Sequence, residues 1–120
     1  MARSGNDRFL AGAGRDILNF FPNRVAVVVN LETGTVTGVG NDTARSVEVA
    51  SGSTANDILI GNAADNVLSG LLGDDEIYGG AGDDKLDGNG YGGIGGVDLL
   101  DGGDGADRCL NGTTVLNCES

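Results

Sequence analysis

Acidic side chains recur at a fixed interval through the second half of the sequence. Written in rows of nine from Gly52, the sequence places a carboxylate or a carboxamide in the sixth column of successive rows. These residues are Asp57, Asn66, Asp75, Asp84, Asp98 and Asp107. Their oxygen atoms are hard ligands, which hard metal cations prefer over nitrogen or sulfur. The first chemistry that the sequence predicts is therefore metal binding by oxygen.

The other columns describe the elements that must position these oxygens. The first column is Gly in nearly every row, and the eighth is Leu, Ile or Cys. Glycine adopts backbone angles closed to other residues and lets neighbouring loops approach closely. The last three residues of a row suffice only for a short strand, with its middle residue pointing inward. Each row thus predicts a loop and a strand, and the fixed period indicates a solenoid in which two rows complete one turn.

Two rows carry a specific motif. GGAGDDKLD (79–87) and GGDGADRCL (102–110) fit the pattern G-G-x-G-x-D-x-U-x. The sequence therefore resembles the RTX, or haemolysin-type, calcium-binding nonapeptide repeats, strongly over 52–119 and moderately over 2–19. The resemblance implies an all-β fold, a right-handed parallel β-roll or β-solenoid, that binds several Ca²⁺ ions, up to about four.

The resemblance also implies which residues hold calcium, since in the family an ion lies between loops two rows apart. One stack of side-chain ligands would be Asp57, Asp75 and Asp98, and the other Asn66, Asp84 and Asp107. The implied carbonyl ligands belong to Gly70, Leu72, Gly73, Gly79, Gly80, Ala81, Gly82, Gly102, Gly103, Asp104 and Gly105. The fifth-column acids, Asp65, Asp74 and Asp83, are expected to point outward. The alternative interpretation is that all these acids form only a solvated acidic face.

We expect one continuous domain with three parts. Residues 1–19 form two degenerate repeats, 20–51 a β-rich insertion or cap, and 52–119 the calcium-binding rows. The insertion contains two valine-rich runs around a turn at Thr33–Gly34, which predicts a hairpin or wider coils. Within the rows, 88–92 breaks the phase and is expected to bulge out, and 111–119 has Leu116 in place of the acid and forms a C-terminal cap.

The two cysteines, Cys109 and Cys118, occupy the eighth column of consecutive rows, so both are expected to enter the core from the middle of a strand. A disulfide that closes the last turn is the favoured interpretation and fits an oxidising compartment. The alternative is a pair of buried free thiols that act as small core residues.

Composition excludes several classes of function. The net charge is −11, which disfavours nucleic acid and anionic membrane surfaces as partners, and no apolar run is long enough to span a membrane. Histidine is absent and no nucleophile–base pair is visible, so no enzymatic activity is expected. One buried aliphatic residue per row is too little to offset the entropy of ordering nine residues, so folding is expected to require the metal.

The function that we expect is that of a calcium-binding RTX-type β-roll module, secreted from a bacterium. In the family such modules fold on binding calcium outside the cell and stabilise an attached protein or aid its secretion, so linked domains of a larger secreted protein are the expected partners. The alternative is an extracellular ligand-recognition module, for a polysaccharide or in an adhesin, in which calcium is structural. The sequence does not identify a small-molecule or glycan ligand.

Overall fold

The computed structural model is built from short β-strands. It describes residues 8–10, 16–21, 24–38, 41–45, 47–88 and 96–118. Within these ranges the chain has no helix, and hence none that is long and apolar enough to cross a membrane. The strands are β1 (Arg8–Leu10), β2 (Ile17–Asn19), β3 (Val28–Asn30), β4 (Thr35–Thr37), β5 (Asn41–Arg45), β6 (Val49–Ser51), β7 (Ile58–Ile60), β8 (Val67–Ser69), β9 (Glu76–Tyr78), β10 (Lys85–Asp87), β11 (Leu99–Asp101), β12 (Arg108–Leu110) and β13 (Thr114–Leu116).

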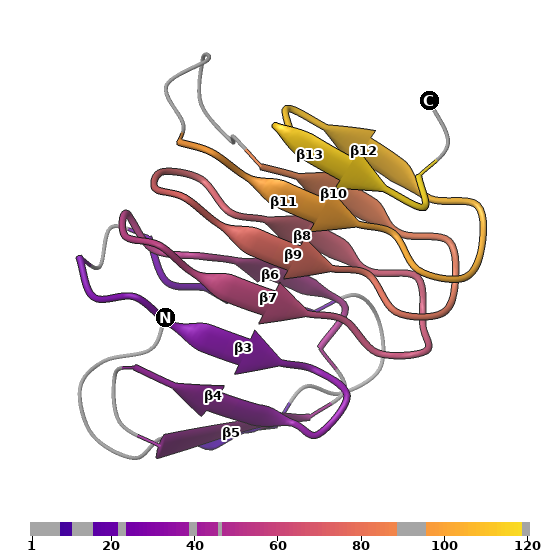
Figure 1. Ribbon diagram of the computed structural model, residues 1–120. Coiled ribbons are helices and arrows are strands. Elements are labelled where there is room, and N and C mark those ends of the chain that lie inside the picture. Colours follow the sequence, from indigo (N-terminus) through magenta and orange to yellow (C-terminus); the bar gives the residue numbers. More distant parts are fainter. Residues whose placement is uncertain are drawn as a thin grey trace.

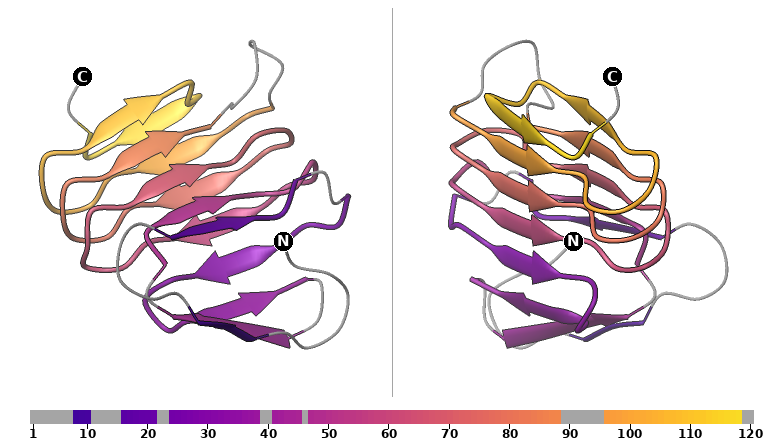
Figure 2. Two further views of the ribbon diagram at one scale, coloured as in Figure 1. Left: turned by 180° about the vertical axis from the view of Figure 1, so that it is seen from behind. Right: turned by 45° about the vertical axis from the view of Figure 1, so that its right-hand side comes forward.

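The strands form two sheets that face each other (Figure 1). One sheet has the order β1-β5-β4-β3-β7-β9-β11-β13 and the other β12-β10-β8-β6-β2. From β6 onward consecutive strands alternate between the sheets, so the chain winds as a flattened coil (Figure 2). All strand pairs are parallel except β3–β4 and β4–β5. The predicted all-β fold with parallel strands, consistent with a β-roll, is confirmed.

The register of the sheets follows the nine-residue period. Leu59 faces Ile77, which lies 18 residues later, as expected when two rows make one turn. Ile77 in turn faces Leu100, and Leu86 faces Cys109, both across 23 residues. The five extra residues therefore leave the stack in phase. Apart from Gly88, the predicted bulge at 88–92 lies outside the described residues.

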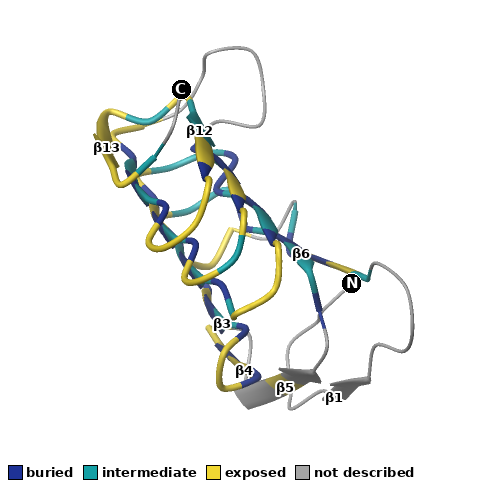
Figure 3. Cartoon of the chain, turned by 90° about the vertical axis from the view of Figure 1, so that its right-hand side faces the viewer, coloured by how far each residue is buried: buried dark blue, intermediate teal, exposed yellow. Residues whose placement is uncertain are grey.

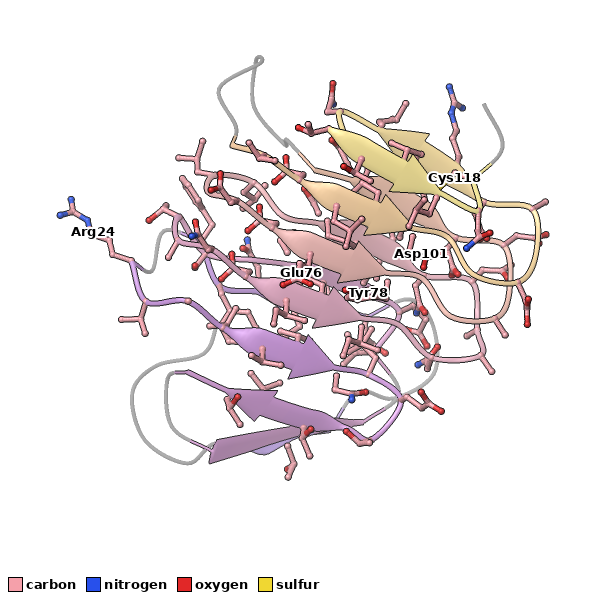
Figure 4. The ribbon with its side chains drawn as sticks, viewed as in Figure 1. Arg24, Glu76, Tyr78, Asp101 and Cys118 are labelled. Carbon is pink, nitrogen blue, oxygen red and sulfur yellow. A yellow bond between two sulfur atoms is a disulfide. The ribbon has the colours of Figure 1, made fainter. Side chains whose placement is uncertain are left out.

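The core is a column of strand-centre side chains between the two sheets. The strand-centre residue of β6, Ala50, is fully buried, and the larger strand-centre residues of six further roll strands are at most 3% exposed; their neighbours in the strands are less buried (Figure 3). These are Leu18, Leu59, Leu68, Ile77, Leu86 and Leu100. On the outer face of β9, the Tyr78 hydroxyl donates to Glu76 Oε1 at 2.8 Å (Figure 4). Each buried aliphatic side chain contributes about 1.5–3 kcal/mol to folding.

The segment before the regular rows contains the predicted hairpin. Strands β3 and β4 pair in antiparallel fashion around a turn in which Gly34 N–H donates to the Asn30 carbonyl at 2.9 Å. Gly34 has a φ of 76°, and Asn30 Oδ1 accepts from the N–H groups of Glu32 and Thr33. The two valine-rich runs therefore form a hairpin within the eight-stranded sheet, between β5 on one side and β7 on the other.

The last row departs from the predicted register. Strand β13 spans Thr114–Leu116 and sets Val115 opposite Leu100, so Val115, and not Cys118, is the strand-centre residue. The prediction that Cys118 enters the core from the middle of a strand is wrong. Asn111 and Asn117 have φ values of 58° and 50°, which bend the chain early and late in this row. Among the described strands none covers Val115, which is 46% exposed.

Candidate metal centre

The sixth-column residues all precede a strand directly and are all buried. Their side chains are between 1% and 3% exposed, although five of the six carry a carboxylate. The pairs of residue and following strand are Asp57 and β7, Asn66 and β8, Asp75 and β9, Asp84 and β10, Asp98 and β11, and Asp107 and β12. Because the strands alternate between sheets, these side chains fall on two edges of the roll.

Hydrogen bonds connect the residues of each edge into a ladder. On one edge, Asp57 N–H donates to Asp75 Oδ1 and Asp75 N–H donates to Asp98 Oδ1, both at 2.8 Å. On the other edge, Asn66 N–H donates to Asp84 Oδ1 at 2.7 Å. Asp84 N–H donates to Asp107 Oδ1 at 2.8 Å. The structure thus brings the six predicted side-chain ligands together in two stacks of three.

The ladders include residues that the sequence analysis missed. Asp16 N–H donates to Glu48 Oε2 at 3.0 Å, Val27 N–H donates to Asp57 Oδ1 at 2.8 Å, and Asp98 N–H donates to Thr113 Oγ1 at 3.3 Å. Glu48 could have been found, because the nine-residue phase extends back to 43–51 with Glu48 in the sixth column and a small apolar residue in the eighth. Val27 and Thr113 contribute through a backbone amide and a third-column hydroxyl, for which the repeat gives no signal.

Several carboxylate oxygens of the ladders are buried without a hydrogen-bond partner. Among the described residues these are the Oδ2 atoms of Asp16, Asp75, Asp84 and Asp107. Burial raises the pKa of Asp75 to about 7, with a smaller contribution from neighbouring carboxylates, and raises the pKa of Asp84 to about 6. A buried carboxylate that lacks a partner is costly, and a bound cation removes that cost. These oxygens therefore fit a metal.

Loop carbonyls lie beside these carboxylates because the first column is glycine. A Cβ atom added to Gly79 would lie 2.6 Å from Asp84 Oδ2 and 2.6 Å from the Gly102 carbonyl oxygen. A Cβ at Gly52 would likewise meet Asp57 Oδ2 and the Gly70 carbonyl oxygen. Carboxylate and carbonyl oxygens thus approach each other at the first column, which is the donor set that Ca²⁺ prefers.

Loop carbonyls offer further oxygen atoms besides the carboxylates. No group of three or more Asp, Glu or Cys side chains suited to a metal occurs in the part of the chain that the structure describes. Of the predicted carbonyls, Gly73 O accepts from Gly96 N–H and Gly80 O accepts from Asp104 N–H, each at 3.0 Å, which leaves a second lone pair on each oxygen. Gly82 is half-buried, as is Leu72. Four other residues of the predicted carbonyl set are exposed: Ala81, Gly103, Asp104 and Gly105.

The RTX calcium-binding nonapeptide repeat family matches this chain in four copies, over residues 1–19 and 51–86. These two segments therefore contain RTX calcium-binding nonapeptide repeats. This confirms the resemblance and indicates a calcium-binding β-roll module of a structural, non-catalytic family that is typical of secreted bacterial proteins. The match stops at Leu86, before the phase is interrupted, whereas the hydrogen-bonded ladder continues to Asp107. No curated protein matches the chain significantly.

The RTX loops are joined by a second, outer set of hydrogen bonds. Asp65 Oδ1 accepts from Asp83 N–H at 2.8 Å, and Asp83 Oδ1 accepts from Ala106 N–H at 2.9 Å. Asp74 Oδ1 accepts from Val97 N–H at 2.7 Å. The fifth-column acids are exposed, as expected, but each also ties its loop to the loop of the next turn.

A disulfide joins the last two rows of the roll. Cys109 lies in β12 and packs against the core, and Cys118 follows β13, with their Cα atoms 5.8 Å apart (Figure 4). The bond links one sheet to the segment that leaves the other. It therefore holds the C-terminal turn closed although Cys118 is not a strand residue.

Proposed function

We propose that the chain is a calcium-binding β-roll module that folds on binding calcium outside the cell and stabilises, or aids the secretion of, an attached protein. The observation that carries this proposal is the set of buried, unpartnered carboxylate oxygens at Asp75, Asp84 and Asp107 beside loop carbonyls. Such an arrangement is expected of a protein whose folded state requires a cation.

The proposed ligands come from among the sixth-column side chains, above all those with an unpartnered oxygen, and from the carbonyls of the glycine-rich loops. Calcium, when bound, supplies positive charge and accepts oxygen ligands from two loops at once, at up to about four inter-loop positions. The chain's own part is to keep carboxylates of successive turns in register through the ladder bonds, such as that from Asp84 N–H to Asp107 Oδ1. Without the cation these stacked negative charges oppose folding.

Calcium affinity in such a module suits a switch between compartments. Extracellular calcium modules typically bind in the range of about 10⁻⁴–10⁻³ M, which is reached outside cells and not in the cytoplasm. A disulfide between Cys109 and Cys118 is also compatible with an oxidising compartment. Both features support folding after export.

The rest of the chain is proposed to complete the same domain. We assign residues 20–51 as a cap, because β3, β4 and β5 continue the eight-stranded sheet beyond β7 and cover the edge that β7 would otherwise expose. The coil is proposed to be right-handed, since crossovers between parallel strands of a sheet nearly always are.

Circular dichroism of the whole chain tests the proposal. The β-signal is measured in excess chelator and then in millimolar calcium, with magnesium at equal concentration as the control. Calcium should produce or strongly increase the β-signal, and magnesium should not, because its stricter octahedral geometry suits these loops poorly. A β-signal that is unchanged in chelator would contradict coupling between calcium and folding.

A further inference from the structure

The carboxylate of Asp57 differs from those of Asp75, Asp84 and Asp107 because hydrogen bonds from the protein satisfy both of its oxygens. Oδ1 accepts from Val27 N–H at 2.8 Å and from the Ser53 hydroxyl at 2.7 Å. Oδ2 accepts from Ser53 N–H at 2.7 Å. Ser53 is fully buried, and its hydroxyl in turn accepts from Ala55 N–H at 3.0 Å. This loop is therefore closed by hydrogen bonds alone.

Asn66 closes the next loop in the same manner and without charge. Its Oδ1 accepts from Asn62 N–H at 2.9 Å, and its Nδ2 donates to the Glu48 carbonyl at 3.2 Å. An amide N–H₂ group is a donor and does not bind a cation. The side-chain oxygen is thus bonded within its own loop, and the side-chain nitrogen donates to a carbonyl of the preceding turn.

The rows of Asp57 and Asn66 differ from the rows of Asp75, Asp84 and Asp107 in the backbone conformation of the second-column residue. In the rows of Asp75, Asp84 and Asp107 the second-column residue has a positive φ. These residues are Leu71 (75°), Gly80 (91°) and Gly103 (83°). In the same three rows the sixth-column Oδ2 has no partner. Ser53 and Asn62 do not have a positive φ, and their N–H groups bond the sixth-column side chain.

The backbone conformation of the second-column residue therefore decides whether the sixth-column carboxylate of the same row keeps an oxygen without a hydrogen-bond partner. A positive φ rotates the second-column amide, and Gly103 N–H indeed donates to Asp101 Oδ1 at 3.1 Å and not to Asp107. Leu71 adopts this conformation although a side chain with a Cβ is strained there, so the open loop is kept at a cost in the row of Asp75. Asp16 has an unpartnered oxygen too, but the second column of its row lies outside the described residues.

We propose that the roll is divided: cations bind at the loops of Asp75, Asp84 and Asp107, whereas the loops of Asp57 and Asn66 are closed by protein hydrogen bonds and bind none. The inference rests on the proposed calcium function and makes it specific to particular turns. Calcium then binds between the loops of Asp75 and Asp98 and between the loops of Asp84 and Asp107. It does not bind between the loops of Asp57 and Asp75 or between those of Asn66 and Asp84. The turns near the N-terminal hairpin act as a metal-independent base for the calcium-dependent turns.

Equilibrium dialysis of the whole chain against calcium tests this division, with circular dichroism in saturating calcium on each variant. Asp57→Asn and Asp84→Asn are matched, since they make the same change in the same column, and Asn66 demonstrates that a carboxamide fits a closed loop. Asp57→Asn should bind as many ions as the natural chain. Asp84→Asn and Asp107→Asn should each lose about one ion or more, through loss of a ligand or of the turn that it holds.

The outcomes separate this inference from the proposed function. A lower ion count for Asp57→Asn, or an unchanged count for both Asp84→Asn and Asp107→Asn, would overturn the division and leave calcium binding itself standing. A natural chain that binds no calcium would overturn both.

Discussion

Replacing one core residue should shift the calcium needed for folding, and the size of the shift reports the number of ions. Leu86 is fully buried at the centre of β10, where its ladder neighbours are Leu68 and Cys109. Both neighbouring backbones are fixed in the sheet, so the space left by Leu86→Ala cannot collapse. The expected loss of folding free energy is about 3 kcal/mol, within the range of about 2–5 kcal/mol for such cavities.

This loss is converted into a calcium midpoint through linkage. Each bound ion contributes RT times the logarithm of free calcium to the stability of the folded state. A loss of about 3 kcal/mol therefore raises the midpoint about 13-fold with two cooperative ions and about 4-fold with four. The midpoint is measured by circular dichroism at buffered free calcium. The measurement thus discriminates between the divided roll and a roll with every position filled.

The control is Val115→Ala, at the equivalent centre of β13. Val115 is 46% exposed, so the loss is below about 1 kcal/mol and the midpoint shifts less than about threefold. Equal shifts for the two variants would refute the packing argument. A normal midpoint for Leu86→Ala would refute the coupling between core packing and calcium.

Three further predictions concern the disulfide, the loops and pH. Replacing Cys109 and Cys118 by Ser should lower the free energy of unfolding in calcium by about 2–3 kcal/mol, measured by urea denaturation; a stability equal to that of the oxidised chain would contradict it. Gly82→Ala should lower the free energy of unfolding by about 1 kcal/mol or more in the same assay, because Gly82 has a φ of 89° and an added Cβ would lie 2.7 Å from the Ala64 carbonyl oxygen. The control, Ala81→Gly at the adjacent exposed position, should lower it by less. In chelator, the folded-state pKa values of Asp75 and Asp84, about 7 and about 6, lie above the ordinary 3.8, so the folded form holds protons more tightly. The stability that these raised pKa values provide is complete below about pH 4 and is lost as pH rises through about 6–7. The calcium-free β-signal should therefore be larger at about pH 5 than at about pH 8. A larger signal at about pH 8 would refute this prediction.

The sequence predicts the roll well where a column has a single physical role. The eighth column requires an inward aliphatic residue and the sixth a polar residue before a strand, and both assignments hold from Asp57 to Asp107 across the interrupted phase. The sixth-column stacks follow from the two-row turn alone. Even Glu48, which was missed, obeys the same phase.

Prediction fails where the backbone conformation decides the outcome. The second column reads as Ser, Asn, Leu or Gly, and nothing in these letters reveals that Leu71 has a positive φ while Ser53 does not. In the last row the loop before β13 spans only 111–113, with Asn111 in a left-handed conformation, so Val115 becomes the strand centre and Cys118 lies beyond the strand. Left-handed conformations at residues other than glycine are not encoded by the period of the repeat.

The alternation of strands between the sheets imposes a parity rule on changes in length. Removing a single row would transfer every later strand to the opposite sheet, and every later carboxylate to the opposite edge, where it would meet a different ladder partner. Removing two rows would leave each later residue above an equivalent neighbour, as Ile77 lies above Leu59. Extra residues within a loop change neither, since Leu100 still pairs with Ile77 across its longer connection. A change of two rows therefore keeps every later strand in its own sheet, a change of one row exchanges the sheets, and a change in loop length does neither.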